Sequence, residues 1–150
     1  MITRNDIQKL CVSASNAGFN VYPNDIELVQ WNVGIQTHIP VKLPTNKAAI
    51  YIFKWNDTYL KVGKVNSKSN ARYQSQHYNP NSTNSNLSKS LLGDTEFQAL
   101  VGDSSIGERI KENTTRFNIL IPTNLEKNFV HFAEAFFILK CNPRFENTRV

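Results

Sequence analysis

The chain has 150 residues, of which 40% are hydrophobic and 11% aromatic. That is enough for one domain with an ordinary core, and it excludes a chain that is disordered by composition. The formal net charge of +5 favours polyanionic partners, chiefly nucleic acid or an anionic membrane surface.

Cys11 and Cys141 form neither a metal pattern nor a disulfide framework. The N-terminus lacks the apolar core of a signal peptide, and no apolar run approaches the roughly 18 residues of a membrane span. We therefore expect a soluble, cytoplasmic protein without a membrane partner.

Residues 5–17 have the periodicity of an amphipathic helix, with Thr3 and Asp6 in a capping-box relation before it. Three prolines punctuate residues 20–45, within which residues 36–43 could form a short edge strand. We interpret residues 1–46 as an N-terminal extension and residues 47–150 as the main domain.

Two β-rich runs, AAIYIFKW and TYLKVGK, flank Asn56-Asp57 and predict a hairpin over residues 48–64. A helix capped by Asn66 or Ser67 should follow and run to about His77. Residues 79–86 are an Asn/Ser/Pro stretch typical of an exposed loop.

The remaining pattern predicts short helices over residues 87–92 and 104–112, a strand over 116–121 and a long helix over 124–140. Thr123 and Glu126 have the spacing of a capping box for the last helix. The element order indicates an α+β fold, with a small antiparallel sheet of three strands flanked by helices.

Short motifs lie at informative places in this pattern. Ala49-Ile50-Tyr51 falls on the first strand, Lys61-Val62-Gly63 on the second, Arg72 on the next helix and Glu134 inside the apolar HFAEAFF segment. Over residues 48–147 the chain thereby resembles the GIY-YIG nuclease superfamily. The resemblance implies the GIY-YIG fold and a Mg²⁺-dependent DNA endonuclease, with Mn²⁺ as another usable cation. Tyr51, Lys61, Arg72 and Glu134 would be catalytic, and Glu134 would bind the metal.

Three positions depart from the family pattern. Ala49 replaces the first glycine, and Glu146 followed by Asn147 stands where the family has an asparagine. Lys61 replaces a tyrosine, as it can in restriction endonucleases of the superfamily, so the resemblance favours a restriction-like enzyme.

The hairpin register decides whether Tyr51 and Lys61 can share a site. A two-residue turn pairs Tyr51 with Val62 and turns Lys61 to the other face, so a shared site requires an odd loop or a bulge. An ammonium near the tyrosine hydroxyl would favour the phenolate, which could act as a general base. Otherwise Tyr51 is a core aromatic residue and Lys61 a surface lysine.

Glu134 has largely apolar helical neighbours, including Val130 and Phe137. A carboxylate there needs a partner, and Mg²⁺ binds one or two carboxylates together with phosphate and water. The alternative is an edge glutamate that is paired with a lysine.

Other basic residues should contact the nucleic acid. Arg72 and Lys64 would bind the scissile phosphate, and His77, Lys68 and Lys89 are further candidates for phosphate or DNA contact. His38, His77 and His131 lack metal-ligand spacing. The polar segment from Lys68 to Lys89 could read bases with its amides or be a plain solvated loop.

Several functions remain open at this stage. A restriction-like enzyme that cuts both strands would normally be a homodimer, whereas a repair-type or mobile-element nuclease would nick as a monomer. A catalytically silent nucleic-acid-binding module would keep the fold alone, and phosphate chemistry does not distinguish DNA from RNA.

Overall fold

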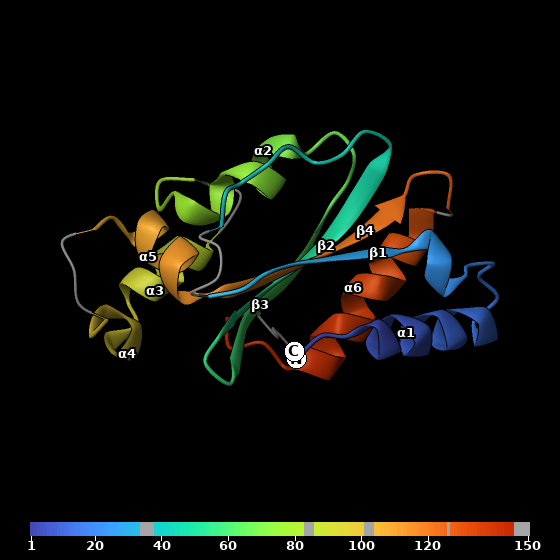
Figure 1. Ribbon diagram of the computed structural model, residues 1–150, viewed down its shortest axis with the longest axis horizontal. Coiled ribbons are helices and arrows are strands. Elements are labelled where there is room, and N and C mark those ends of the chain that lie inside the picture. The colour runs from blue at the N-terminus through green and yellow to red at the C-terminus, as the bar shows by residue number, and fades with distance from the viewer. Residues whose placement is uncertain (34–37, 83–85, 101–103, 126, 146–150) are drawn as a thin grey trace.

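A computed structural model describes residues 1–33, 38–82, 86–100, 104–125 and 127–145. Its helices and strands are, in chain order, α1 (Arg4–Asn16), β1 (Glu27–Trp31), β2 (Lys47–Trp55), β3 (Thr58–Val65), α2 (Asn70–Gln74), α3 (Leu87–Leu92), α4 (Thr95–Gln98), α5 (Ile106–Asn113), β4 (Thr115–Pro122) and α6 (Lys127–Cys141). Single turns of 3-10 helix lie at η1 (Pro23–Asp25) and η2 (Gln76–Tyr78). The fold is α+β, as predicted (Figure 1). Within the described ranges, no helix combines the length and apolar character needed to cross a membrane.

The sheet has four antiparallel strands in the order β1-β4-β2-β3, so the prediction of three strands was wrong. The additional strand, β1, belongs to the N-terminal extension and pairs with β4. Its side chains are mostly half-buried without a clear alternation, which explains why the pattern gave no strand signal. The edge strand expected over residues 36–43 is absent from the described residues 38–43, and residues 36–37 lie outside the described ranges.

The other helix and strand predictions agree with the structure to within a few residues. The helix expected to continue to His77 instead ends at Gln74, and η2 follows. Helix α4 was not predicted, and α6 begins at Lys127 rather than at residue 124. Glu126 of the expected capping box, residues 83–85 of the polar loop, and Glu146 with Asn147 lie outside the described residues.

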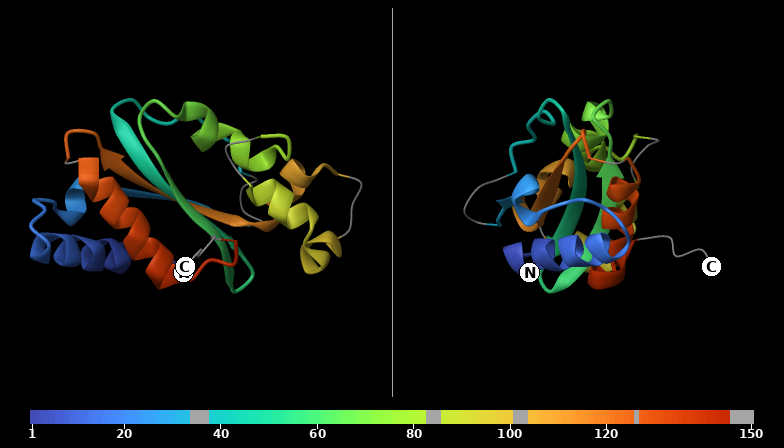
Figure 2. Two further views of the ribbon diagram at one scale, coloured as in Figure 1. Left: turned by 180° about the vertical axis from the view of Figure 1, so that it is seen from behind. Right: turned by 90° about the vertical axis from the view of Figure 1, so that its right-hand side faces the viewer.

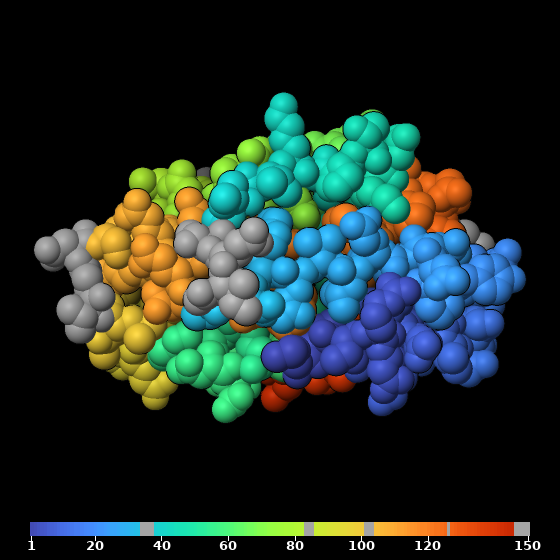
Figure 3. All heavy atoms as spheres, viewed as in Figure 1, coloured from blue at the N-terminus to red at the C-terminus, as the bar shows by residue number. Residues whose placement is uncertain are grey.

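The two faces of the sheet carry separate cores. Helices α1 and α6 lie side by side and pack on one face (Figure 2). The shorter helical elements α2, η2, α3, α4 and α5 pack on the other. Alternate residues of β2 divide between the faces: Ile50 and Ile52 join the first core, and Tyr51 and Phe53 join the second. The segments coloured blue to cyan, which come from residues 1–46, cover much of the surface seen in Figure 3.

Asp6 joins the two helices of the first layer. Its carboxylate accepts hydrogen bonds from the Thr3 backbone N–H at 2.8 Å and from the Thr3 hydroxyl at 3.1 Å, and it pairs with Lys140 of α6 at 2.8 Å. Burial alone would raise the pKa of Asp6, but the hydrogen bonds from Lys140 and Thr3 outweigh burial and hold the pKa below its ordinary value.

We expect Asp6→Ala to lower the free energy of unfolding by about 1–2 kcal/mol at neutral pH, because it removes a helix cap and a partly buried ion pair. Because the pKa of Asp6 is lower in the folded protein, its ionised carboxylate stabilises the fold at pH values above the ordinary pKa of 3.8. The difference between variant and wild type should therefore shrink as the pH falls below about 4. Urea unfolding measures both effects. Asp57→Ala, at a fully exposed carboxylate, is the control, and an equal loss in both variants would contradict the assignment.

Candidate active site

A bulge in β3 brings Lys61 onto the face of the sheet that carries Tyr51. The hairpin has a two-residue turn that pairs Trp55 with Thr58, and the register then shifts so that Phe53 pairs with Lys61 and Tyr51 with Gly63. The extra residue is Leu60, which lies between the two registers. The bulge that a shared site requires is therefore present.

The candidate catalytic side chains line one pocket of about 220 Å³ at the free edge of β3. Tyr51 and Lys61 approach from one face of the sheet. Lys64 lies on the other face, where it meets Glu134 of α6, and Arg72 is contributed by α2. Because β3 is an outer strand, side chains from both faces meet around its edge. The complete lining is Tyr51, Lys61, Val62, Gly63, Lys64, Arg72 and Glu134.

Gly63 lets the Tyr51 side chain lie directly against the backbone of β3. A Cβ atom added at Gly63 would come within 2.5 Å of Tyr51 Cζ and would collide with the hydroxyl. Tyr51 is 3% exposed, so the surrounding core leaves its ring little room to move. The glycine of the second motif thus has a packing role in placing the Tyr51 hydroxyl in the pocket.

Glu134 forms an ion pair with Lys64 across the pocket. Their side chains are 21% and 32% exposed, so Glu134 is neither solvated nor fully buried. This contact matches the alternative given by the sequence, a glutamate paired with a lysine. The lysine is Lys64, which was expected to bind phosphate. Mg²⁺ retains several waters and needs only one or two carboxylates beside phosphate. Glu134 is therefore a suitable ligand for such a cation, provided that the cation displaces Lys64. In the described ranges no three metal-ligating side chains gather.

Asn86 orients Lys61. Its side-chain oxygen accepts a hydrogen bond of 2.5 Å from Lys61 Nζ, and it lies at the N-cap of α3, just after the polar loop. The contact joins residues 25 positions apart, so nothing in the local sequence pattern indicated it.

His77 lies beneath Tyr51, with ring centroids 4.1 Å apart, and is fully buried. Burial, assisted by the positive charges of Arg116, Lys61 and Arg72, holds the His77 pKa well below its ordinary value, so the ring is neutral. The DNA contact expected of His77 does not fit this burial. His38 is also buried, and burial together with Arg116 lowers its pKa to about 4.

Arg116 of β4 anchors the layer that carries Arg72. Its guanidinium donates to Asn118 Oδ1 at 2.9 Å, to the Tyr78 hydroxyl at 2.9 Å and to the Tyr73 carbonyl at 2.7 Å. It also lies over the rings of Trp31, Phe53 and Tyr73, at 5.0, 5.2 and 4.8 Å from their centroids. These contacts fix α2 and η2 against β1, β2 and β4.

The basic residues around the pocket differ in position. Lys68 is exposed and lines a hollow that it shares with Arg72. Lys89 is exposed on α3, and the described linings of the pockets around Arg72 do not include it. Lys127 and His131, to which the sequence assigned no role in the site, line an adjoining pocket from α6. The spacing of Lys127, His131 and Glu134 places them on one face of a helix. This spacing could have indicated from the sequence that they lie near one site.

The chain was compared with family models, with curated proteins and with solved structures, and none of them matches. The interpretation of the site therefore depends on its geometry and on the motif resemblance.

We expect Gly63→Ala to lower the free energy of unfolding by about 1–3 kcal/mol, because the new methyl group forces Tyr51 out of its packed position. Urea unfolding measures the loss, and the NMR signals of the Tyr51 ring report the displacement. Gly93→Ala is the control, since its Cβ would have Ser90 O as nearest neighbour at 3.7 Å. A Gly63→Ala protein with wild-type stability and unchanged Tyr51 signals would refute the proposed packing role.

Proposed function

We propose that the chain is a Mg²⁺-dependent endonuclease that hydrolyses phosphodiester bonds in DNA, in the manner of a restriction-like GIY-YIG nuclease. The observation that carries the proposal is that Tyr51, Lys61, Arg72 and Glu134 line one pocket although they come from four elements. The bulge that turns Lys61 to the side of Tyr51 supports the same proposal.

Tyr51 and Lys61 form the basic part of the proposed site. Lys61, held by Asn86, lies on the same face of the sheet as Tyr51, and an ammonium there would favour the phenolate. The phenolate takes a proton from water, whose oxygen attacks the phosphorus. As the new P–O bond forms, the bond to the 3′-oxygen breaks, and that oxygen takes a proton from solvent, which leaves a 5′-phosphate and a 3′-hydroxyl end.

Arg72 and Lys64 neutralise the phosphate in this scheme. The guanidinium donates to the non-bridging oxygens, where negative charge develops as the five-coordinate state forms. Lys64, which pairs with Glu134 in the absence of substrate, transfers its contact to the phosphate and frees the carboxylate for Mg²⁺. The chemistry that bound Mg²⁺ supplies is polarisation of the phosphate and stabilisation of the leaving oxygen.

A catalytically silent nucleic-acid-binding module is the second candidate. The observation that favours it is the Lys64–Glu134 ion pair, which already satisfies the carboxylate without a metal. Nicking as a monomer, cutting both strands as a homodimer, and action on RNA are further versions of the nuclease proposal.

We expect purified protein to cleave plasmid or phage DNA with Mg²⁺ or Mn²⁺ and not with EDTA. Glu134→Gln and Tyr51→Phe should each slow single-turnover cleavage by about 100-fold or more, because one removes the metal ligand and the other the base. Gel electrophoresis of the products measures the rate.

Two exposed residues offer matched controls for this assay. The variants Glu112→Gln on α5 and Tyr22→Phe, at a residue that is 64% exposed, should cleave at the wild-type rate. Metal-dependent cleavage that survives both pocket substitutions would overturn the proposed site. Specific DNA binding without cleavage of any substrate would favour the binding module instead.

A further inference from the structure

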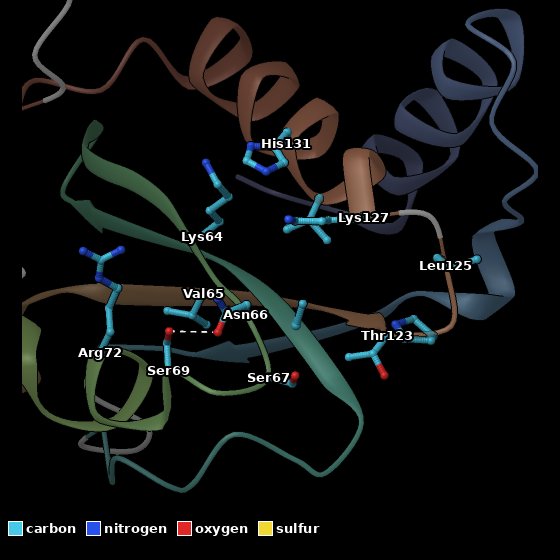
Figure 4. Close-up of a pocket in the computed structure, with 13 residues that line it drawn as sticks. Lys64, Val65, Asn66, Ser67, Ser69, Arg72, Thr123, Leu125, Lys127 and His131 are labelled. Atoms are coloured by element: carbon cyan, nitrogen blue, oxygen red, sulfur yellow. Dashed lines mark hydrogen bonds between the residues drawn. The ribbon is translucent and has the colours of Figure 1, made fainter.

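A second pocket, of about 340 Å³, adjoins the candidate catalytic pocket and shares Lys64 and Arg72 with it. Residues 64–72 form one side of it, and the turn after β4 together with the first half of α6 forms the other (Figure 4). In Figure 4, Lys127 and His131 project from α6 on the side opposite Ser69 and Arg72. The pocket volume is within the range of small-molecule sites.

The pocket has an apolar floor and a cationic rim. The apolar lining is Ala48, Val65, Pro122, Leu125 and Val130, and the cationic or titratable rim is Lys64, Arg72, Lys127 and His131. Asn66, Ser67, Ser69 and Thr123 add amide and hydroxyl groups. Of the described residues that line it, none carries a carboxylate. Such a lining fits a ligand with a flat, largely apolar body and an anionic group.

We propose that this pocket binds one unpaired nucleotide of the nucleic-acid strand that is cut, next to the scissile phosphate. Its base lies on the floor formed by Val65, Leu125 and Val130, and its phosphate lies at Lys127. The base must be unpaired because a base that is stacked and paired in a duplex is not free to enter a side pocket. The position relative to the cut rests on the proposed function, whereas nucleotide binding itself does not.

The binding test uses the full chain in EDTA, so that no cleavage can contribute. Deoxyadenosine 5′-monophosphate, deoxyadenosine and inorganic phosphate are titrated separately, and the NMR shifts of Val65, Leu125 and Val130 are followed. We expect the nucleotide to bind at least about tenfold more tightly than either fragment, because base and phosphate contribute together. Equal affinity for nucleotide and inorganic phosphate, or shifts confined to other residues, would overturn the proposal.

Lys127→Glu should weaken nucleotide binding by about tenfold or more. Lys127 is exposed in the first turn of α6. A glutamate there interacts favourably with the helix dipole, so we expect the variant to fold. The matched control is Lys9→Glu on α1, which makes the same charge change at an exposed site lining a different hollow and should leave the affinity unchanged. Equal effects of the two substitutions would mean general charge attraction and would refute the site. If the protein binds the nucleotide at this pocket but cleaves no substrate, the proposed nucleotide site stands and the proposed nuclease function is refuted.

Discussion

One buried cation, Arg116, fixes the helical layer that carries Arg72 against the sheet. Its guanidinium is fully buried, and the partners described above are neutral oxygens and aromatic faces. Because removing these partners would leave a buried charge unsatisfied, at a cost of several kcal/mol, α2 and η2 are held where Tyr73 and Tyr78 meet it. Arg72 precedes Tyr73 in the chain, so the same contact fixes Arg72, the proposed phosphate ligand, relative to the sheet.

The charge distribution around this cation suits an anionic substrate. Burial, assisted by Arg116, lowers the pKa of His77 beneath Tyr51, so the positive charge near the pocket comes from lysine and arginine side chains. Lys61, Lys64 and Arg72 face the pocket, and Glu134 is balanced by its lysine. Under the proposed function, a phosphate in the pocket would compete with Glu134 for Lys64, and substrate binding would then free the carboxylate for the metal.

Much of the fold could be predicted from local sequence patterns, but the long-range contacts that arrange the site could not. The hairpin and α6 could be predicted. An odd loop or a bulge was expected only if Tyr51 and Lys61 share a site, and the structure has a two-residue turn with a bulge at Leu60. Strand β1 gave no alternating signal. The Lys64–Glu134 pair and the Arg116–Tyr73 contact join residues 70 and 43 positions apart, which no local periodicity reports. His77 was misplaced because its burial depends on packing between layers.

Mn²⁺ titration of the full chain, followed by paramagnetic broadening of its NMR signals, tests the central claim most directly. Mn²⁺ replaces Mg²⁺ at oxygen ligands and broadens the signals of nearby nuclei. If Glu134 holds the metal, the signals of Gly63, Lys64 and Ala133 should broaden first in the wild type, and Glu134→Gln should abolish this selectivity. Equal broadening in both proteins, or first broadening far from the edge of β3, would contradict a metal-dependent site in this pocket.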